Sequence, residues 1–141
     1  MENILYGALP LDRAHSIRHD AKALEALRRS PDKLVVPNWR ELSLVAGEEA
    51  AVLAEGTQAA ELLDLASEVV LLGLTGSGAP VFAADLSKSE PEADGGGPAL
   101  GLGGAWTGLR AVGALLPAGD AALLGYARAM MIWHHRSRFC G

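Results

Sequence analysis

The feature that most constrains the fold is a pair of apolar runs in the middle of the chain. Residues 68–74 read EVVLLGL, residues 80–86 read PVFAADL, and the sequence TGSG at 75–78 lies between them. Short runs rich in branched side chains on both sides of a glycine-containing turn are typical of a β-hairpin. Residues 69–72 are continuously apolar, which indicates a central strand covered on both faces of its sheet. The chain is therefore expected to build a sheet around this hairpin.

A second hairpin is predicted over residues 33–46. Strand-like runs at 34–36 and 42–45 lie on either side of Pro37-Asn38, and both of these residue types are common in turns. A third short strand is expected at 51–53.

Four helices are predicted from the spacing of apolar residues and from residues that begin or end helices. They cover residues 21–29, 57–66, 105–116 and 120–137. Thr57 is expected to cap the second helix. The residues expected to face inward from the second and third helices are Ala60, Leu63 and Ala66, and then Trp106, Leu109, Val112 and Leu116.

The last of these helices is the longest. Asp120 suits its beginning because a carboxylate complements the positive end of the helix dipole. Gly125 lies inside it and costs up to about 1 kcal/mol relative to Ala, so we expect close packing against a neighbour there. The apolar stripe of the helix is expected to comprise Leu123, Leu124, Ala127, Met130 and Met131.

Composition limits the classes of protein to which the chain can belong. Its 141 residues are 50% hydrophobic, which is enough for one domain with a core. A net charge of −5 does not favour a dedicated nucleic-acid-binding domain, because such domains are usually basic. A single cysteine excludes an intrachain disulfide and suits a reducing compartment. With no visible secretory signal or membrane-spanning run, we predict a cytoplasmic protein without a membrane partner.

We therefore predict an α+β domain over residues 1–137, with a mixed, hairpin-rich β-sheet, flanking helices and a long C-terminal helix. The segment 87–104 is rich in Gly, Pro and acidic residues, and it is predicted to be a mobile loop.

Two patterns resemble ligand-binding motifs but lack essential parts. His15 and His19 would share one face of a helix, as in two-His metal sites, but the accompanying Glu is missing and a surface role is favoured. The glycines at 101–104 do not match a phosphate-binding fingerprint, so a flexible loop is favoured there as well.

The end of the chain gathers several reactive or basic residues, namely His134, His135, Arg136, Arg138 and Cys140. Cations near the C-terminus of a helix more often complement its dipole than take part in catalysis. Cys140 is a poor candidate nucleophile, because a nucleophilic cysteine needs a shaped pocket. A lone Cys followed by Gly instead suggests the first half of a zinc knuckle that continues beyond residue 141.

Several segments, taken in order, carry a family resemblance. The most specific are Tyr126-Ala127-Arg128-Ala129, Trp133-His134 and Phe139-Cys140-Gly141; weaker ones are 11–14 with Arg18, 70–74, 82–86 and 106–110. Together they resemble the N-terminal, Nudix-like domain of the NADH pyrophosphatases, a family of the Nudix hydrolase superfamily. In that family the tail motif leads into a zinc ribbon.

The resemblance implies a non-catalytic domain followed by the start of a truncated zinc ribbon at 138–141. The longer parent would also carry a catalytic Nudix domain and would hydrolyse NADH or NAD to a nicotinamide mononucleotide and AMP, using Mg²⁺ or Mn²⁺. Some family members remove NAD caps from RNA, and homodimers are usual. Cys140 corresponds to the first of four structural zinc ligands. One cysteine cannot hold a tetrahedral Zn²⁺, so this chain alone is expected to bind no cofactor.

The catalytic box of the superfamily is not expected in this chain. Arg40-Glu41-Leu42 matches the start of its REUxEE segment, but residues 44–45, which should be glutamates, are Leu-Val. No catalytic residue is therefore assigned. Two alternatives stay open: a stand-alone protein-interaction module with no enzymatic parent, and RNA binding through Arg128, Arg136 and Arg138.

Overall fold

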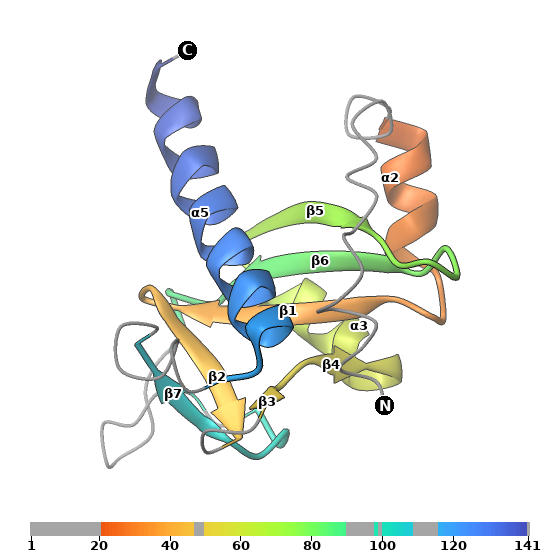
Figure 1. Cartoon of the computed structure of the whole chain (residues 1–141). Coiled ribbons are helices and arrows are strands. Elements are labelled where there is room, and N and C mark those ends of the chain that lie inside the picture. The colour runs from red at the N-terminus through yellow and green to blue at the C-terminus, as the bar shows by residue number, and fades with distance from the viewer. Residues whose placement is uncertain (1–20, 47–49, 90–97, 99, 109–115, 141) are drawn as a thin grey trace.

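A computed structural model of the chain describes residues 21–46, 50–89, 98, 100–108 and 116–140 (Figure 1). These ranges contain three helices and seven strands. In chain order the elements are α2 (Ala21–Arg28), β1 (Leu34–Trp39), β2 (Leu42–Ala46), β3 (Ala50–Ala51), β4 (Ala54–Glu55), α3 (Gly56–Leu65), β5 (Glu68–Leu74), β6 (Pro80–Asp85), β7 (Ala105–Thr107) and α5 (Ala118–Cys140). The predicted α+β class with a mixed sheet is confirmed.

The strands form one sheet in the order β3-β2-β1-β6-β5, with β4 also paired to β1 and β7 to β2. The central pair, β1 with β6, is parallel, and its register runs from Leu34 opposite Val81 to Asn38 opposite Asp85. The other pairings are antiparallel. Two local hairpins, β1–β2 and β5–β6, are therefore joined side by side through a parallel contact.

Each face of the sheet carries its own apolar cluster. Alternating residues of β1 divide between them: Val36 packs with Leu124 of α5 on one face, and Val35 packs with Leu62 of α3 on the other. This division follows from the period of two in a strand. Figure 1 shows α5 crossing one face of the sheet, with α3 on the opposite side.

The turn of the first hairpin lies at Arg40-Glu41, so the predicted turn at Pro37-Asn38 is wrong. Pro37 and Asn38 both belong to β1. Pro37 lies opposite Ala84 in the parallel register with β6, but the backbone carbonyl of its neighbour Asn38 is the one that faces β6, where it accepts from the Leu86 amide. The nitrogen of Pro37 therefore faces the antiparallel side of β1, whose ladders do not include Pro37, and no ladder hydrogen bond is lost.

Two further predictions about the sheet need correction. Residues 105–107 form strand β7 against β2, rather than the start of a helix; residues 109–115 lie outside the described chain. Strand β5 is covered on both faces, since Leu72 and Leu71 belong to different clusters, but it ends the described strand order instead of lying at its centre. The third strand is found at Ala50–Ala51.

The helices agree better with expectation. Helix α3 begins at Gly56 with Glu55 at its N-cap position, so Thr57 is not the cap. Its buried residues are Ala59, Leu62 and Leu63, whereas Ala60 and Ala66 are only partly buried. Helix α5 has Asp120 in its first turn and continues to Cys140. None of the described helices is long and apolar enough to cross a membrane.

A candidate ligand pocket at the ends of β1 and β6

The candidate site lies where the two parallel strands end. On the face covered by α5, β1 presents Leu34 and Val36, and β6 presents the buried pair Val81 and Ala83. The next position along both strands is polar.

These two polar residues, Asn38 and Asp85, are opposite each other in the parallel register. The α5-covered face thus changes from apolar to polar on a single rung of the sheet. Ligands of open sheets commonly bind beyond the carboxyl ends of parallel strands, so this rung is the natural place to look for a site.

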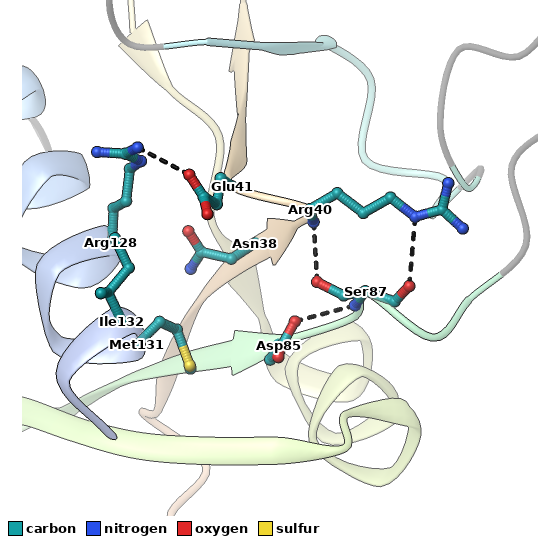
Figure 2. Close-up of a pocket in the computed structure, with 8 residues that line it drawn as sticks. All are labelled: Asn38, Arg40, Glu41, Asp85, Ser87, Arg128, Met131 and Ile132. Carbon is teal, nitrogen blue, oxygen red and sulfur yellow. Dashed lines mark hydrogen bonds and ion pairs between the residues drawn. The ribbon is translucent and has the colours of Figure 1, made fainter. Parts of the chain in front are cut away.

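A pocket of about 580 Å³ opens over this rung. Figure 2 shows Asn38 and Asp85 at the strand ends, with Glu41 beside Asn38 and Arg128 on the facing helix. Its volume falls within the range of about 300–1,000 Å³ that is usual for small-molecule sites. The lining residues are Asn38, Arg40, Glu41, Asp85, Ser87, Arg128, Met131 and Ile132.

Asn38 and Asp85 are both deeply buried, with 4% and 5% of their surfaces exposed. The Asn38 side-chain nitrogen donates a long hydrogen bond of 3.4 Å to the Val36 carbonyl. One carboxylate oxygen of Asp85 accepts a 3.0 Å hydrogen bond from the Ser87 backbone amide. Two adjacent buried polar groups at the bottom of a pocket are unusual, because burial of such groups costs free energy unless hydrogen bonds offset it.

One rim of the pocket is the two-residue turn between β1 and β2. Arg40 and Glu41 have φ values of 51° and 67°, the left-handed region that a type I′ hairpin turn requires at both central positions. Asn and Gly are the usual residues there, and other residues lose about 1–2 kcal/mol each. This turn therefore keeps two side chains at a cost in backbone free energy.

Each of the two side chains makes a long-range contact. Glu41 accepts a hydrogen bond of 2.9 Å from Arg128 of α5, forming an ion pair across the pocket mouth. Arg40 extends the opposite way (Figure 2): its backbone amide donates to the Ser87 hydroxyl at 2.8 Å, and its guanidinium carbon lies 4.6 Å from the centre of the Trp39 ring. The turn is thus held against both α5 and the end of β6.

The remaining wall is apolar and comes from α5. Met131 is buried, and Ile132 is partly buried beside it. The pocket therefore combines a polar floor, an apolar wall and a charged rim, a combination that suits a small organic molecule with a few polar groups.

Sequence reasoning did not find this pocket. The sequence predicts Asn38 in a turn and Asp85 near the end of a strand, and it indicates no functional role for either residue. The available signal is that both apolar strands, LVVPNW and PVFAAD, carry one polar residue close to their ends. The sequence points to Arg128 as part of the family-like tail segment and as a possible RNA contact, and not as part of a pocket.

The residues predicted to be related to metal binding are not among the described residues that line the pocket. Cys140 is the last residue of α5, at the far end of the helix from the sheet (Figure 1), and the expected zinc role of its side chain stays a prediction. His15 and His19 lie outside the described residues. Where side chains are described, no group of three or more His, Cys, Asp or Glu residues is arranged to hold a metal ion.

Comparison with known proteins agrees with the architecture. A family model described as the NADH pyrophosphatase-like rudimentary NUDIX domain matches residues 32–133, from the segment before β1 well into α5. A comparison with curated proteins found no match. Since the family model covers most of the sequence, the chain belongs to the NADH pyrophosphatase-like rudimentary NUDIX domain family.

Proposed function

We propose that this chain is the non-catalytic N-terminal domain of an NADH pyrophosphatase and that its role is architectural. The observation that carries this proposal is the form of α5, which has 23 residues. At a rise of about 1.5 Å per residue it is about 35 Å long. The part of α5 up to Met131 packs on the sheet, and the end of the helix projects beyond it (Figure 1). Such a helix can hold a following module at a fixed distance and direction.

Contacts along its first half keep α5 in place. Asp120 binds the backbone of β3, Tyr126 donates a 3.3 Å hydrogen bond to the Leu72 carbonyl of β5, and Arg128 pairs with Glu41. The helix therefore contacts both ends of the strand order as well as the β1–β2 turn. These separate attachment points limit rotation as well as translation of the helix.

The β2 strand supports assigning catalysis to another domain. Leu44 and Val45 occupy the positions at which a Nudix box would need metal-binding glutamates, and they are 4% and 1% exposed in the core. A carboxylate in either place would be buried among apolar side chains, at a cost in desolvation free energy. In the proposed parent, the Mg²⁺- or Mn²⁺-dependent hydrolysis of NADH or NAD belongs to a separate catalytic domain.

Two further roles are proposed for the second half of α5. Cys140 would be the first ligand of a structural Zn²⁺ in a zinc ribbon. Trp133, with 61% of its surface exposed, would lie in the contact with a second copy of the chain, since tryptophan is enriched in protein interfaces.

The catalytic part of the proposal is tested by incubating the chain with NADH and Mn²⁺ and measuring AMP. We expect no AMP above a blank without protein, and robust metal-dependent turnover would refute the proposed non-catalytic role.

The self-association part is tested by sedimentation equilibrium of the wild-type chain and the Trp133→Glu variant. A concentration-dependent dimer that the substitution abolishes would support it. Ala122→Glu is the matched control, because Ala122 is also exposed on α5 but lies three turns from Trp133. Equal association by wild type and Trp133→Glu would exclude Trp133 from the interface.

A further inference from the structure

We propose that a second pocket, at the beginning of β1 and β6, binds a small dipolar molecule with one ammonium and one carboxylate group, such as a free amino acid. The second pocket has a volume of about 630 Å³, which is within the usual range for small-molecule sites. It lies at the opposite end of the parallel strand pair from the pocket over Asn38 and Asp85. The proposal goes beyond the architectural role and does not depend on it, because neither AMP release nor self-association tests this pocket.

Three segments form the walls of the second pocket. They are the turn before β1 at 31–34, the beginning of α3 at 55–57, and the loop between β5 and β6 at 75–79. Sheet pairing brings them together, because Leu34 is opposite Glu55 on one side of β1 and opposite Val81 on the other. The loop between β5 and β6 lies at the same edge of the sheet as the beginning of β1 (Figure 1). The register of the sheet therefore fixes the positions of these walls.

Lys33 supplies a buried cation. It lines the second pocket with only 7% of its surface exposed, and lysine is rarely buried to this extent unless an acid pairs with it. Its ammonium donates a hydrogen bond of 3.1 Å to the Ser30 carbonyl, and within the described residues no carboxylate forms an ion pair with it. One carbonyl satisfies only one of three ammonium hydrogens. The buried positive charge therefore predicts an anionic group in the ligand.

Two carboxylates line the second pocket at exposed positions, namely Asp32 and Glu55. Within the described part of the chain neither of them forms an ion pair, although Lys33 lines the same pocket. Charges of both signs thus lie around one cavity without contacting each other. A singly charged ligand would be repelled by one of the two signs. A dipolar ligand can direct its carboxylate toward Lys33 and its ammonium toward the exposed carboxylates.

Hydroxyl groups add donors for the carboxylate of the ligand. The hydroxyls of Thr75 and Ser77 share one hydrogen bond of 3.0 Å, and Thr75 Oγ1 also accepts from the Ala79 amide at 3.1 Å. The two hydroxyls have two hydrogens, and the bond between them uses one. No acceptor for the other hydrogen is recorded in the described structure, so it can bind a carboxylate oxygen.

The remaining lining is apolar and comes from Pro31, Leu34 and Ala79. Such surface favours a ligand with an aliphatic part, because covering it removes apolar area from water. A bare inorganic anion would leave this surface uncovered and would also face Asp32 and Glu55. The lining therefore favours an organic dipolar molecule over phosphate or sulfate.

The test is titration of the whole 141-residue chain with two matched series of probes, followed by ligand-observed NMR or calorimetry. Leucine is compared with isocaproate, which lacks the ammonium group, and with isoamylamine, which lacks the carboxylate. In the same way, ε-aminocaproate is compared with caproate and pentylamine. We expect leucine or ε-aminocaproate to bind at millimolar concentration or below, and both of its singly charged analogues to bind about tenfold more weakly. The tighter of the two dipolar ligands shows whether adjacent or separated charges are preferred.

Variants assign each charge of the ligand to its partner in the pocket. Lys33→Met keeps an unbranched side chain without the ammonium group, so the dipolar ligand should bind about tenfold more weakly, with an affinity close to that of its amine analogue. Asp32→Asn combined with Glu55→Gln should instead bring the affinity close to that of the carboxylate analogue. Since these two residues are exposed, the double variant provides a second readout if Lys33→Met does not fold.

Lys88→Met is the matched control. Lys88 is also exposed to loss of one positive charge by this substitution, but it lies beyond the end of β6, at the opposite edge of the sheet from the second pocket. This variant should leave the affinity unchanged. A loss of affinity as large as that of Lys33→Met would mean that net charge alone matters, and it would overturn the proposal.

Three further results would also overturn the proposal. The first is no binding of leucine or ε-aminocaproate at millimolar concentration. The second is equal affinity of the wild-type chain for a dipolar ligand and for one of its singly charged analogues. The third is unchanged affinity in both Lys33→Met and the Asp32→Asn, Glu55→Gln double variant.

Discussion

The carboxylate of Asp120 accepts a hydrogen bond of 2.8 Å from the backbone amide of Ala51. Asp120 lies in the first turn of α5, and Ala51 lies in β3, at one end of the strand order. The contact joins the beginning of the helix to a strand of only two residues. It also places a negative charge where the helix dipole favours it.

Replacing this carboxylate should lower the stability of the fold. Asp120 is 1% exposed, and Asp120→Ala would leave the partly buried Ala51 amide without its acceptor, so the free energy of unfolding should fall by about 1–2 kcal/mol. Asp120→Asn keeps an acceptor and should lose less. Urea denaturation measures both. A change below about 0.5 kcal/mol for the alanine variant would contradict the importance of this bond.

Gly103 and Gly104 provide a matched pair of substitutions. Both have positive φ, 78° and 76°, so alanine at either position should cost about 1 kcal/mol or more. A Cβ at Gly104 would also lie 2.7 Å from the Val45 carbonyl oxygen, whereas at Gly103 it would meet nothing within 4 Å. Gly104→Ala should therefore lower the melting temperature clearly more than Gly103→Ala. Equal losses of melting temperature in the two variants would mean that the positive φ alone, and not the contact with Val45, determines the cost.

Gly125 should behave in the opposite way. Within the described part of the chain the expected close packing against it is not found, since an added Cβ would meet nothing there within 4 Å. Because Gly is poor inside helices, Gly125→Ala should raise the free energy of unfolding by about 0.5–1 kcal/mol. Thermal unfolding followed by circular dichroism measures this change. A less stable variant would show that a neighbouring group packs against Gly125 and clashes with the added methyl group.

Glu41 should tolerate glycine better than alanine. Both substitutions remove the ion pair with Arg128. The side chains of Arg128 and Glu41 are 42% and 65% exposed, so this ion pair should contribute less than about 1 kcal/mol to stability. Glycine also relieves the strain at φ 67°. Glu41→Gly should therefore be more stable than Glu41→Ala by about 1 kcal/mol in chemical denaturation. The reverse order would argue against the left-handed turn.

Ser43 should accept alanine without loss. Its hydroxyl is buried in β2 with no hydrogen-bond partner recorded in the described structure. Removing it should leave stability unchanged or raise it by about 1 kcal/mol. Ser77→Ala is the control, because the Ser77 hydroxyl lies 3.0 Å from that of Thr75 and its loss should be mildly destabilising. A large loss for Ser43→Ala would reveal a partner for the hydroxyl.

The elements with strong local signals were predictable from the sequence. Strand β5 matches the predicted 68–74, and β6 ends one residue before its predicted end, because branched apolar runs and a glycine turn act over a few residues. Helix α2 also matches closely. The family resemblance, carried mainly by the tail motif, is confirmed by the family match.

The errors occur where distant pairing decides the outcome. Trp106 has helical spacing to other apolar residues, yet its segment pairs with β2. The turn moved from Pro37-Asn38 to Arg40-Glu41 because β1 continues in register with β6 up to Asn38 and Asp85. The same pairing creates the pocket floor. Local sequence patterns carry no information about which strand will lie beside which. The turn could therefore not be derived from them, and the polar residue near the end of each strand indicates a pocket floor only once the pairing is known.

The parallel pairing of β1 with β6 also has a consequence for the order of events during synthesis. The β1–β2 hairpin is complete once residue 46 is made, but the other edge of β1 must wait for β6, which ends at Asp85. Long-range parallel pairs form slowly, and strand edges that await a partner can pair with other chains. We therefore expect the nascent chain to be prone to aggregation from the time that β1 emerges from the ribosome. This risk should end only when the second hairpin emerges and β6 pairs with β1.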